Sequence, residues 1–340
     1  MTVDAGSRKT VELPMSLLYN HTPMSLPIHV VHGRQDGPTL FVSAAVHGDE
    51  LNGVEIIRRL LKLSRLRRLR GTLIAAPVVN VYGFISGIRY LPDRRDLNRS
   101  FPGSAGGSLA AQLANLFMRE IVGRSTHGID LHTGAIHRTN FPQIRADLTN
   151  DTLKHMAAAF AAPLMLDASH LDGSLRGAAT EREVPTLVYE AGEALRFDEF
   201  ALRVGLRGVT RVMQALRMFG KADPIESKTR PILARSSYWV RAPAGGVLRS
   251  RVPTGSKIET NGVLGTIADP FGYQEETVTA GDGGILIGRT NLPAVNQGDG
   301  LFHIARVVDP DRAEQVVEQF RNEVDDDDRL VDADAYDTDD

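Results

Sequence analysis

Cysteine is absent from the 340-residue chain, tryptophan occurs once, and aromatic residues make up only 6% of the sequence. Without cysteine the protein has no disulfide bonds, thiolate metal ligands or cysteine nucleophile, and this composition suits a reducing compartment. No apolar run reaches the roughly 20 residues of a membrane-spanning helix. The polar segment from Met1 to Thr10 has no apolar stretch resembling a signal peptide. We therefore expect a cytoplasmic location and no membrane association.

Charge is distributed unevenly along the chain. Residues 325–340 contain nine Asp and one Arg, a net charge of −8, whereas the whole chain carries −3 at pH 7. The remainder is therefore mildly basic, which favours attraction of small anionic substrates. The tail itself is predicted to be disordered. Basic residues at 58–70 have no aromatic residues among them, so we interpret them as a solvated helix face and expect no nucleic-acid partner.

Apolar runs alternate with segments of helical spacing over the first two thirds of the sequence. Strands are expected at 28–32, 39–46, 72–79, 128–132, 163–166 and 186–190, and helices at 53–69, 109–122, 153–160 and 197–219. This alternation predicts an α/β fold with a mostly parallel or mixed sheet flanked by helices on both faces. We assign it to residues 1–228.

Short apolar runs separated by Gly, Pro and Asn turns follow Pro224. They predict a small all-β barrel or sandwich module at 229–310, which we expect to cap the site of the preceding domain. Its sequence resembles the lipoyl/biotinyl-type barrel, but Lys257 does not occupy the hairpin position that a carrier lysine needs. Residues 311–340 are expected to form a short helix, at 311–323, and the acidic tail.

Two of the apolar runs end in histidines. His47 and Glu50 directly follow the run at 39–46, and His132 is the last residue of the run that ends in Asp130-Leu131-His132. Two imidazoles and one carboxylate leave a fourth coordination position open, as in catalytic rather than structural zinc sites. We therefore predict one Zn²⁺ per chain, held by these three residues. Asp130 faces the same side of its strand as His132 and is a candidate to orient that histidine.

Further segments extend the pattern: Asp96-Leu97-Asn98-Arg99-Ser100-Phe101-Pro102-Gly103, Asp130-Leu131-His132-Thr133-Gly134 and Val188-Tyr189-Glu190-Ala191-Gly192. With His47-Gly48-Asp49-Glu50, they make the chain resemble the succinylglutamate desuccinylase/aspartoacylase family of the zinc carboxypeptidase-like superfamily. The resemblance spans roughly residues 25–305. No single segment is specific, but their order and combination are.

The resemblance implies a role for each matching residue. The zinc ligands would be His47, Glu50 and His132. Asn98 and Arg99 would bind the α-carboxylate of the substrate, a task that suits the planar fork of arginine. Glu190 would act as general base and then as general acid, with Glu193 as its rival. Arg89 would polarise the scissile carbonyl, with Arg94 and Arg95 as alternatives.

These roles predict a zinc-dependent hydrolase that removes an acyl group from a small N-acyl amino acid and that can also act on esters. The identity of the acyl group is not decided by these roles. Succinylglutamate would need a cationic pocket for its distal carboxylate, for which Arg138, Arg145 and Arg176 are candidates. An N-acetyl-diamino acid, as in the branch of the family that degrades ectoine, would instead favour an acidic pocket.

Two other classes of protein share the ligand set or the fold. A metallocarboxypeptidase would cut residues from peptides, but an extended peptide needs an open groove, which long loops and a β module disfavour. A metabolite-binding protein need not retain three metal ligands and a base. Metal content and activity on a blocked amino acid distinguish these alternatives. These features are compatible with a homo-oligomer as well as with a monomer.

Overall fold

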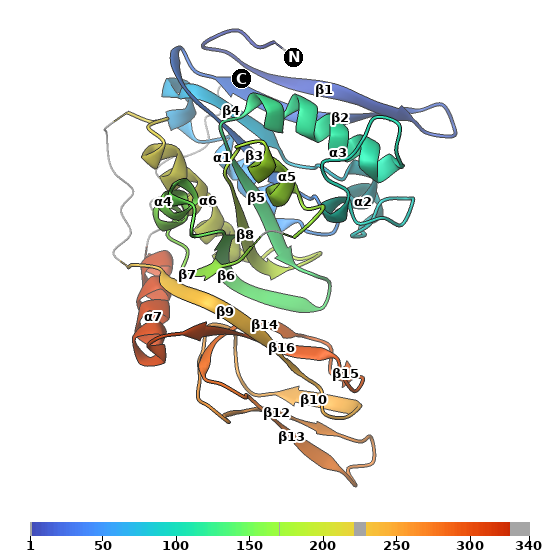
Figure 1. The fold of residues 1–340 in the computed structure, drawn as a ribbon, viewed down its shortest axis with the longest axis vertical. Coiled ribbons are helices and arrows are strands. Elements are labelled where there is room, and N and C mark those ends of the chain that lie inside the picture. The colour runs from blue at the N-terminus through green and yellow to red at the C-terminus, as the bar shows by residue number, and fades with distance from the viewer. Residues whose placement is uncertain (1, 170, 221–228, 327–340) are drawn as a thin grey trace.

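The computed structural model describes residues 2–169, 171–220 and 229–326. The residues between 220 and 229, where the sequence places a domain boundary, and the tail after residue 326 lie outside the described residues. Within the described part, one 12-stranded sheet runs through the molecule in the order β1-β2-β4-β3-β5-β8-β6-β7-β9-β16-β14-β11 (Figure 1). A second sheet has the order β13-β12-β10-β15.

The strands of the larger sheet are β1 (Arg8–Leu17), β2 (Pro23–His32), β3 (Gln35–Ala44), β4 (Arg70–Ala76), β5 (His127–Gly134), β6 (Arg138–Ala146), β7 (Leu164–Asp167), β8 (Thr186–Glu193), β9 (Ile232–Arg241), β11 (Lys257–Ile258), β14 (Gly284–Thr290) and β16 (Gly300–Val307). The smaller sheet contains β10 (Gly246–Ser250), β12 (Val263–Ala268), β13 (Glu275–Thr279) and β15 (Ala294–Val295). Strands β4, β3, β5 and β8 are parallel neighbours. Their carboxyl ends therefore meet at one edge of the sheet.

Helices pack against both faces of this parallel core. The helices are α1 (Asn52–Leu60), α2 (Val81–Ser86), α3 (Leu109–Glu120), α4 (Asp151–Phe160), α5 (Leu175–Glu181), α6 (Glu199–Ala215) and α7 (Pro310–Asp326). Alternate residues of β3 enter different cores: Leu40 and Val42 pack with residues of α1, α4 and α6, whereas Phe41 packs with residues of α3 and α5. Strands covered on both faces are apolar throughout, as the run at 39–46 is. The predicted mixed α/β fold is confirmed.

Several elements differ from the sequence predictions. The helix expected at 53–69 ends at Leu60, and a 3₁₀ helix follows at Ser64–Arg68. Leu63, Leu66 and Leu69 are buried, and a spacing of three matches the three residues per turn of a 3₁₀ helix. The chain also forms β1, β6, α2 and α5, which the sequence analysis missed. Strand β1 is mostly exposed, so it has no apolar run to reveal it.

Of the strands after residue 231, β9, β11, β14 and β16 continue the large sheet, and the other four form the smaller one. Strand β9 pairs in parallel with β7, and β14 pairs antiparallel with β6. In Figure 1 these strands lie below the parallel core, with α7 beside β9. The expected last helix is present as α7, which is three residues longer than predicted at its C-terminal end. None of the described helices combines the length and the apolar character that crossing a membrane requires.

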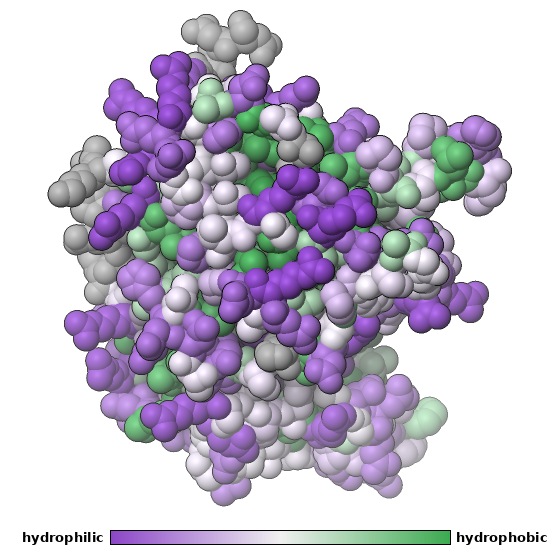
Figure 2. All heavy atoms as spheres, turned by 45° about the horizontal axis from the view of Figure 1, so that its top comes forward, coloured by the Kyte–Doolittle hydropathy of each residue, from purple (hydrophilic) through white to green (hydrophobic). Residues whose placement is uncertain are grey.

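Hydrophilic side chains cover most of the molecular face in Figure 2, and apolar side chains appear there as smaller areas between them. The buried apolar residues instead form clusters inside the molecule, two of which lie on opposite faces of the parallel strands. The polar residues buried at the carboxyl ends of these strands are therefore exceptions to the general pattern. They include His47, Glu50, Asp130 and His132.

Candidate metal centre and active site

His47, Glu50 and His132 come together beyond the carboxyl ends of β3 and β5. His47 and Glu50 lie in the connection between β3 and α1, and His132 lies on β5, the parallel neighbour of β3. The three side chains are buried, and their candidate ligand atoms all lie within 4.8 Å of one another. The edge beyond the carboxyl ends of parallel strands is where open α/β sheets place their ligands.

The turn that carries His47 depends on a close backbone approach. A Cβ atom on Gly48 would lie 2.0 Å from the carbonyl carbon of Gly83 on α2, so only glycine fits there. The Glu50 backbone N–H donates to the His47 carbonyl over 3.1 Å, which brings the two side chains to the same side of the turn. The H-x-x-E spacing thus places both side chains at one point in space.

The carboxylate of Glu50 lies between the two histidines. Its Oε1 is 2.7 Å from His47 Nδ1 and its Oε2 is 2.8 Å from His132 Nδ1. The backbone N–H of Thr133 also donates to Oε2, over 3.1 Å. Both Nδ1 atoms therefore point at one carboxylate, which is the convergence that a single cation bound by all three groups needs.

Asp130 fixes the other side of His132. Its Oδ2 lies 2.7 Å from His132 Nε2, and its Oδ1 accepts a hydrogen bond from Ser43 Oγ over 2.7 Å. The role of Asp130 in orienting this histidine stays a prediction, and this contact is the one that such a role needs. With Nε2–H donated to a carboxylate, Nδ1 is left as the nitrogen that can bind a metal.

The electrostatics of the cluster favour charged forms in spite of burial. Burial is the largest influence on His132 and lowers the pKa of its imidazole, but Asp130 and Glu50 raise this pKa well above its usual value. Burial likewise raises the pKa of Glu50, yet the neighbouring His47 and His132 bring the net shift below its usual value. Two imidazole nitrogens and a carboxylate oxygen are typical zinc ligands, so the donor set fits the predicted ion.

Arg89 is the arginine that lies beside these three residues. Its Nη1 is 3.4 Å from Glu50 Oε1, and its Nε and Nη2 donate to Asp96 Oδ2 over 3.2 Å and 2.9 Å. It lines the same cavity as the histidines, whereas Arg94 and Arg95 are not among the described residues that line it. The structure therefore places Arg89, and not its two alternatives, at the centre.

Asn98 and Arg99 line this cavity from a short 3₁₀ helix, Leu97–Arg99. The side-chain Oδ1 of Asn98 accepts a hydrogen bond from the Leu175 backbone N–H over 2.9 Å. This contact leaves the Nδ2 donors for another partner. Arg99 Nη1 donates to the Asn98 carbonyl over 2.6 Å, and its side chain is exposed at the rim. Both side chains are thus available to an anionic ligand.

Glu190 lies in the C-terminal half of β8, where it is the register partner of His132 on β5. Its Oε2 accepts a hydrogen bond from Asn140 Nδ2 over 2.6 Å, and its Oε1 lies 3.4 Å from Arg145 Nε. Its rival Glu193 contacts Asn291 and Arg196 instead and is not among the described cavity-lining residues. The geometry therefore favours Glu190 as the carboxylate that meets a ligand.

All eight predicted site residues belong to one neighbourhood around a cavity of about 270 Å³. Sequence analysis missed several residues of its lining, among them Asn140, Trp239 and His303. The indole of Trp239 and the imidazole of His303 are stacked, with ring centroids 4.7 Å apart and planes 7° apart. These two residues come from β9 and β16, so strands that follow residue 231 contribute to the lining of the cavity.

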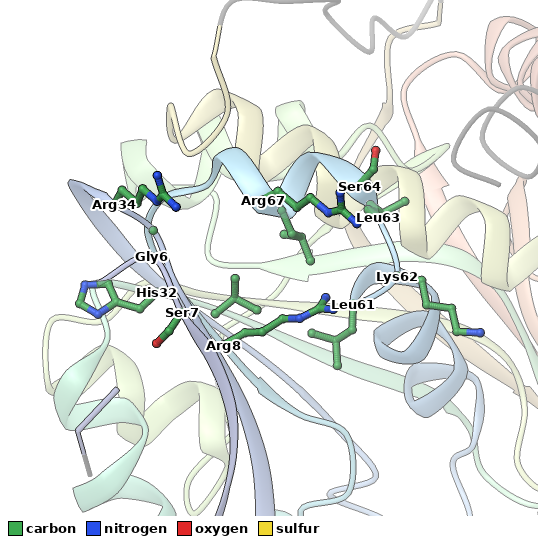
Figure 3. Close-up of a pocket in the computed structure, with 13 residues that line it drawn as sticks. Gly6, Ser7, Arg8, His32, Arg34, Leu61, Lys62, Leu63, Ser64 and Arg67 are labelled. Carbon is green, nitrogen blue, oxygen red and sulfur yellow. The ribbon is translucent and has the colours of Figure 1, made fainter. Parts of the chain in front are cut away.

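A larger cavity, of about 720 Å³, lies elsewhere, between the start of β1, the β2–β3 turn and the segment after α1 (Figure 3). It adjoins Arg34, which precedes β3, whereas His47 follows β3, so the two cavities lie at opposite ends of that strand. Its lining includes Arg8, Arg34, Lys62 and Arg67 but no carboxylate among the described residues. The described lining includes one histidine, His32, but no carboxylate that could join this histidine in binding a metal.

Comparison with known proteins identifies relatives of the whole chain. Residues 36–216 match the succinylglutamate desuccinylase/aspartoacylase catalytic domain family. A curated protein of Halomonas elongata, N-alpha-acetyl-L-2,4-diaminobutyric acid deacetylase, is 28% identical over 301 residues, covering 84% of this chain and 86% of the relative.

Solved structures share the fold at lower identity. A succinylglutamate desuccinylase/aspartoacylase from Rhodobacter sphaeroides has a TM-score of 0.80 at 23% identity, covering 90% of this chain and 98% of the other. The product-bound ectoine utilization protein EutE (DoeB) from Ruegeria pomeroyi has a TM-score of 0.81 at 21% identity, with 89% and 97% covered. These similarities extend over nearly the full length of each chain.

Proposed function

Because the chain belongs to the succinylglutamate desuccinylase/aspartoacylase family, a family of hydrolases, we propose that it is a zinc-dependent deacylase of small N-acyl amino acids. One observation carries this proposal: His47, Glu50 and His132 converge to within 4.8 Å, and Glu190 lines the same cavity. Three ligands with an accessible side and a nearby carboxylate are the components that metal-assisted amide hydrolysis requires.

Each residue of the site has a separate role in the proposed hydrolysis. A zinc ion held by His47, Glu50 and His132 would lower the pKa of a bound water molecule to about 7 and would polarise the acyl carbonyl. Glu190 accepts a proton from the attacking water and donates it to the leaving amine. Arg89 places its positive charge beside the developing oxyanion. Asn98 and Arg99 bind the α-carboxylate and so hold the acyl group at the reaction centre.

Within this class of substrate, we favour one that carries a second anionic group. Arg138, Arg145 and Arg176 all line the cavity. Arg176 Nη1 is buried without a hydrogen-bond partner in the described part of the chain, and Arg145 Nε makes no hydrogen bond there but has Glu190 Oε1 at 3.4 Å. Burial together with Arg145 lowers the pKa of Arg176. Buried donors that lack partners are costly, and a carboxylate of the substrate would satisfy them.

A diamino acid substrate is the second candidate, because the Halomonas elongata relative is a diaminobutyric acid deacetylase by name. A cationic side chain would have to lie near Arg138, Arg145 and Arg176, which would repel it. A zinc ion would add further positive charge to the same cavity. The charge of the lining therefore argues against this candidate, although sequence similarity supports it.

We also propose that the β module at 229–310 limits what can enter. Trp239 and His303 wall the cavity, and the Arg138 guanidinium lies over the Trp239 ring, 5.0 Å from its centroid. A cavity walled on this side accommodates a small molecule more readily than an extended peptide. The arrangement thus favours a deacylase over a metallocarboxypeptidase.

A substrate panel tests these proposals. Zinc-loaded protein would be incubated with N-succinyl-L-glutamate, N-acetyl-L-aspartate, Nα-acetyl-L-2,4-diaminobutyrate and a dipeptide, and release of free amine measured. We expect the highest kcat/KM for a substrate with two carboxylates. Faster hydrolysis of the diaminobutyrate derivative would select the second candidate, and preference for the dipeptide would make the protein a peptidase. A chain that retains no zinc and cleaves nothing would be a binding protein.

A further inference from the structure

The carboxylate of Glu190 is held by a residue from another strand. Asn140 Nδ2 donates to Glu190 Oε2 over 2.6 Å. The nearest cation, Arg145 Nε, lies 3.4 Å from Glu190 Oε1, and this nitrogen makes no hydrogen bond among the described residues. One oxygen of the carboxylate is therefore anchored, while the other can still exchange a proton.

We propose that Asn140, placed by strand β14 of the C-terminal module, is a positioning residue that aims Glu190 at the reaction centre. The proposal rests on the deacylase function proposed above and adds the route by which the module influences the chemical step. In this role Asn140 acts through the carboxylate of Glu190, to which it donates its hydrogen bond. Its amide determines which rotamer the carboxylate occupies when Glu190 accepts a proton from the attacking water molecule.

A continuous row of register partners links Glu190's neighbourhood to the module. Asn140 on β6 is paired with Gly192 on β8 and with Gly288 on β14. Gly288 is paired in turn with His303 on β16, and His303 with Trp239 on β9. Directly opposed residues of antiparallel strands present their side chains on the same face. These paired residues thus connect β8, the strand that carries Glu190, with Trp239 and His303 in the lining of the cavity.

Gly288 makes room for the amide of Asn140. A Cβ atom at Gly288 would lie 2.8 Å from Asn140 Oδ1 and 3.4 Å from His303 Cβ. The atom that would clash is the end of a side chain and not backbone, so the chain can still fold if the Asn140 amide moves away. That movement would carry Nδ2 away from Glu190. An alanine at this position therefore tests positioning with little demand on the fold.

The first experiment removes the amide with Asn140→Ala. Because small misplacements of a catalytic group are costly, we expect kcat to fall by about tenfold to a hundredfold, with KM within about twofold and zinc content unchanged. Asn291→Ala is the matched control, since Asn291 donates a comparable hydrogen bond to Glu193 outside the cavity lining. A kcat within about twofold of the unaltered protein would overturn the proposal.

The second experiment adds a methyl group with Gly288→Ala. We expect a loss of kcat in the same direction as that of Asn140→Ala, although the altered residue lies on another strand. Gly281→Ala is the control, because a Cβ atom at Gly281 meets nothing within 4 Å. If both glycine variants behave like the unaltered protein, Gly288 does not place Asn140.

A double-mutant cycle separates positioning from a general structural role. If Asn140 acts only through Glu190, adding Asn140→Ala to Glu190→Gln should change kcat by less than about twofold. An equal loss in both backgrounds would mean that Asn140 acts elsewhere. The cycle also separates this inference from the proposed function: an unchanged kcat in Glu190→Gln alone would remove the proposed base, whereas additive losses would remove only the role of Asn140.

Discussion

The two parts of the molecule that enclose the cavity supply different kinds of side chain. The parallel core contributes buried charged residues that contact one another, as Glu50 contacts His47 and His132. The β module contributes the stacked rings of Trp239 and His303 and, among the described lining residues, no carboxylate. The residues of the proposed chemistry therefore come from the first part of the chain, whereas β9 and β16 contribute aromatic rings to the lining of the cavity.

The largest effect is expected from His132→Ala in the core. Loss of one of three ligands should release the zinc ion and reduce turnover below detection, because the remaining His47 and Glu50 cannot hold the ion alone. Metal analysis after dialysis measures the first effect. His155→Ala, at an exposed position of α4, is the control. A fully zinc-loaded His132→Ala protein would remove this residue from the ligand set.

Glu190→Gln should lower kcat by ~10²-fold or more. An amide cannot accept the proton of the attacking water, whereas the metal ligands are untouched, so zinc content should stay the same. Glu193→Gln provides the comparison, because Glu193 contacts Asn291 and Arg196 instead of lining the cavity. Equal losses in the two variants would mean that Glu190 is not the base.

A smaller effect is expected at the rim. Arg99→Lys should raise KM by about tenfold, equivalent to one charge-assisted hydrogen bond, because lysine cannot present the planar fork that pairs with a carboxylate. The value of kcat should change little. Arg95→Lys is the control, since Arg95 pairs with Asp93 away from the cavity. Identical KM values for both variants and the unaltered protein would show that Arg99 does not meet the substrate.

The smallest effect is a pH dependence of stability in the module. Burial, with the positive charges of Arg145 and Arg138, lowers the pKa of His303 to about 3. Below about pH 6.5 the unfolded chain binds a proton at this histidine that the folded chain does not. The free energy of unfolding therefore decreases as the pH is lowered, by at most about 1.4 kcal/mol per pH unit. Between pH 7 and pH 5 the urea midpoint of His303→Gln should fall less than that of the unaltered protein. The urea midpoint of His155→Gln should fall between pH 7 and pH 5 as much as that of the unaltered protein. An equal fall for His303→Gln would mean that His303 is not held neutral in the folded protein.

The strand-end residues could be predicted from the sequence because each ends an apolar run. His47, His132 and Glu190 all follow or end such runs, and parallel strands bring their carboxyl ends together. The order and type of the central elements followed from the same alternation. Asp130 could be linked to His132 because residues two apart on a strand share a face.

The contributions of Asn140, Trp239 and His303 could not be predicted in this way. They reach the cavity through pairings of β6 with β14, β14 with β16, and β16 with β9. Pairings between strands that are distant in sequence leave no local pattern, and a single Asn or His in an amphipathic strand has no feature that marks it as part of a site. The short helices α2 and α5 were missed for a similar reason, since each is too short for a helical period to emerge.

The parallel pairing of β7 with β9 also determines how the chain can be divided. A shortened protein ending before β9 would leave the backbone N–H and C=O groups of β7 without their partner strand, and those of β6 without β14. Such bare strand edges recruit other chains and promote aggregation. We therefore expect that the segment after residue 231 cannot be detached or exchanged, because its strands β9, β14 and β16 extend the sheet on which the first two thirds of the chain are built.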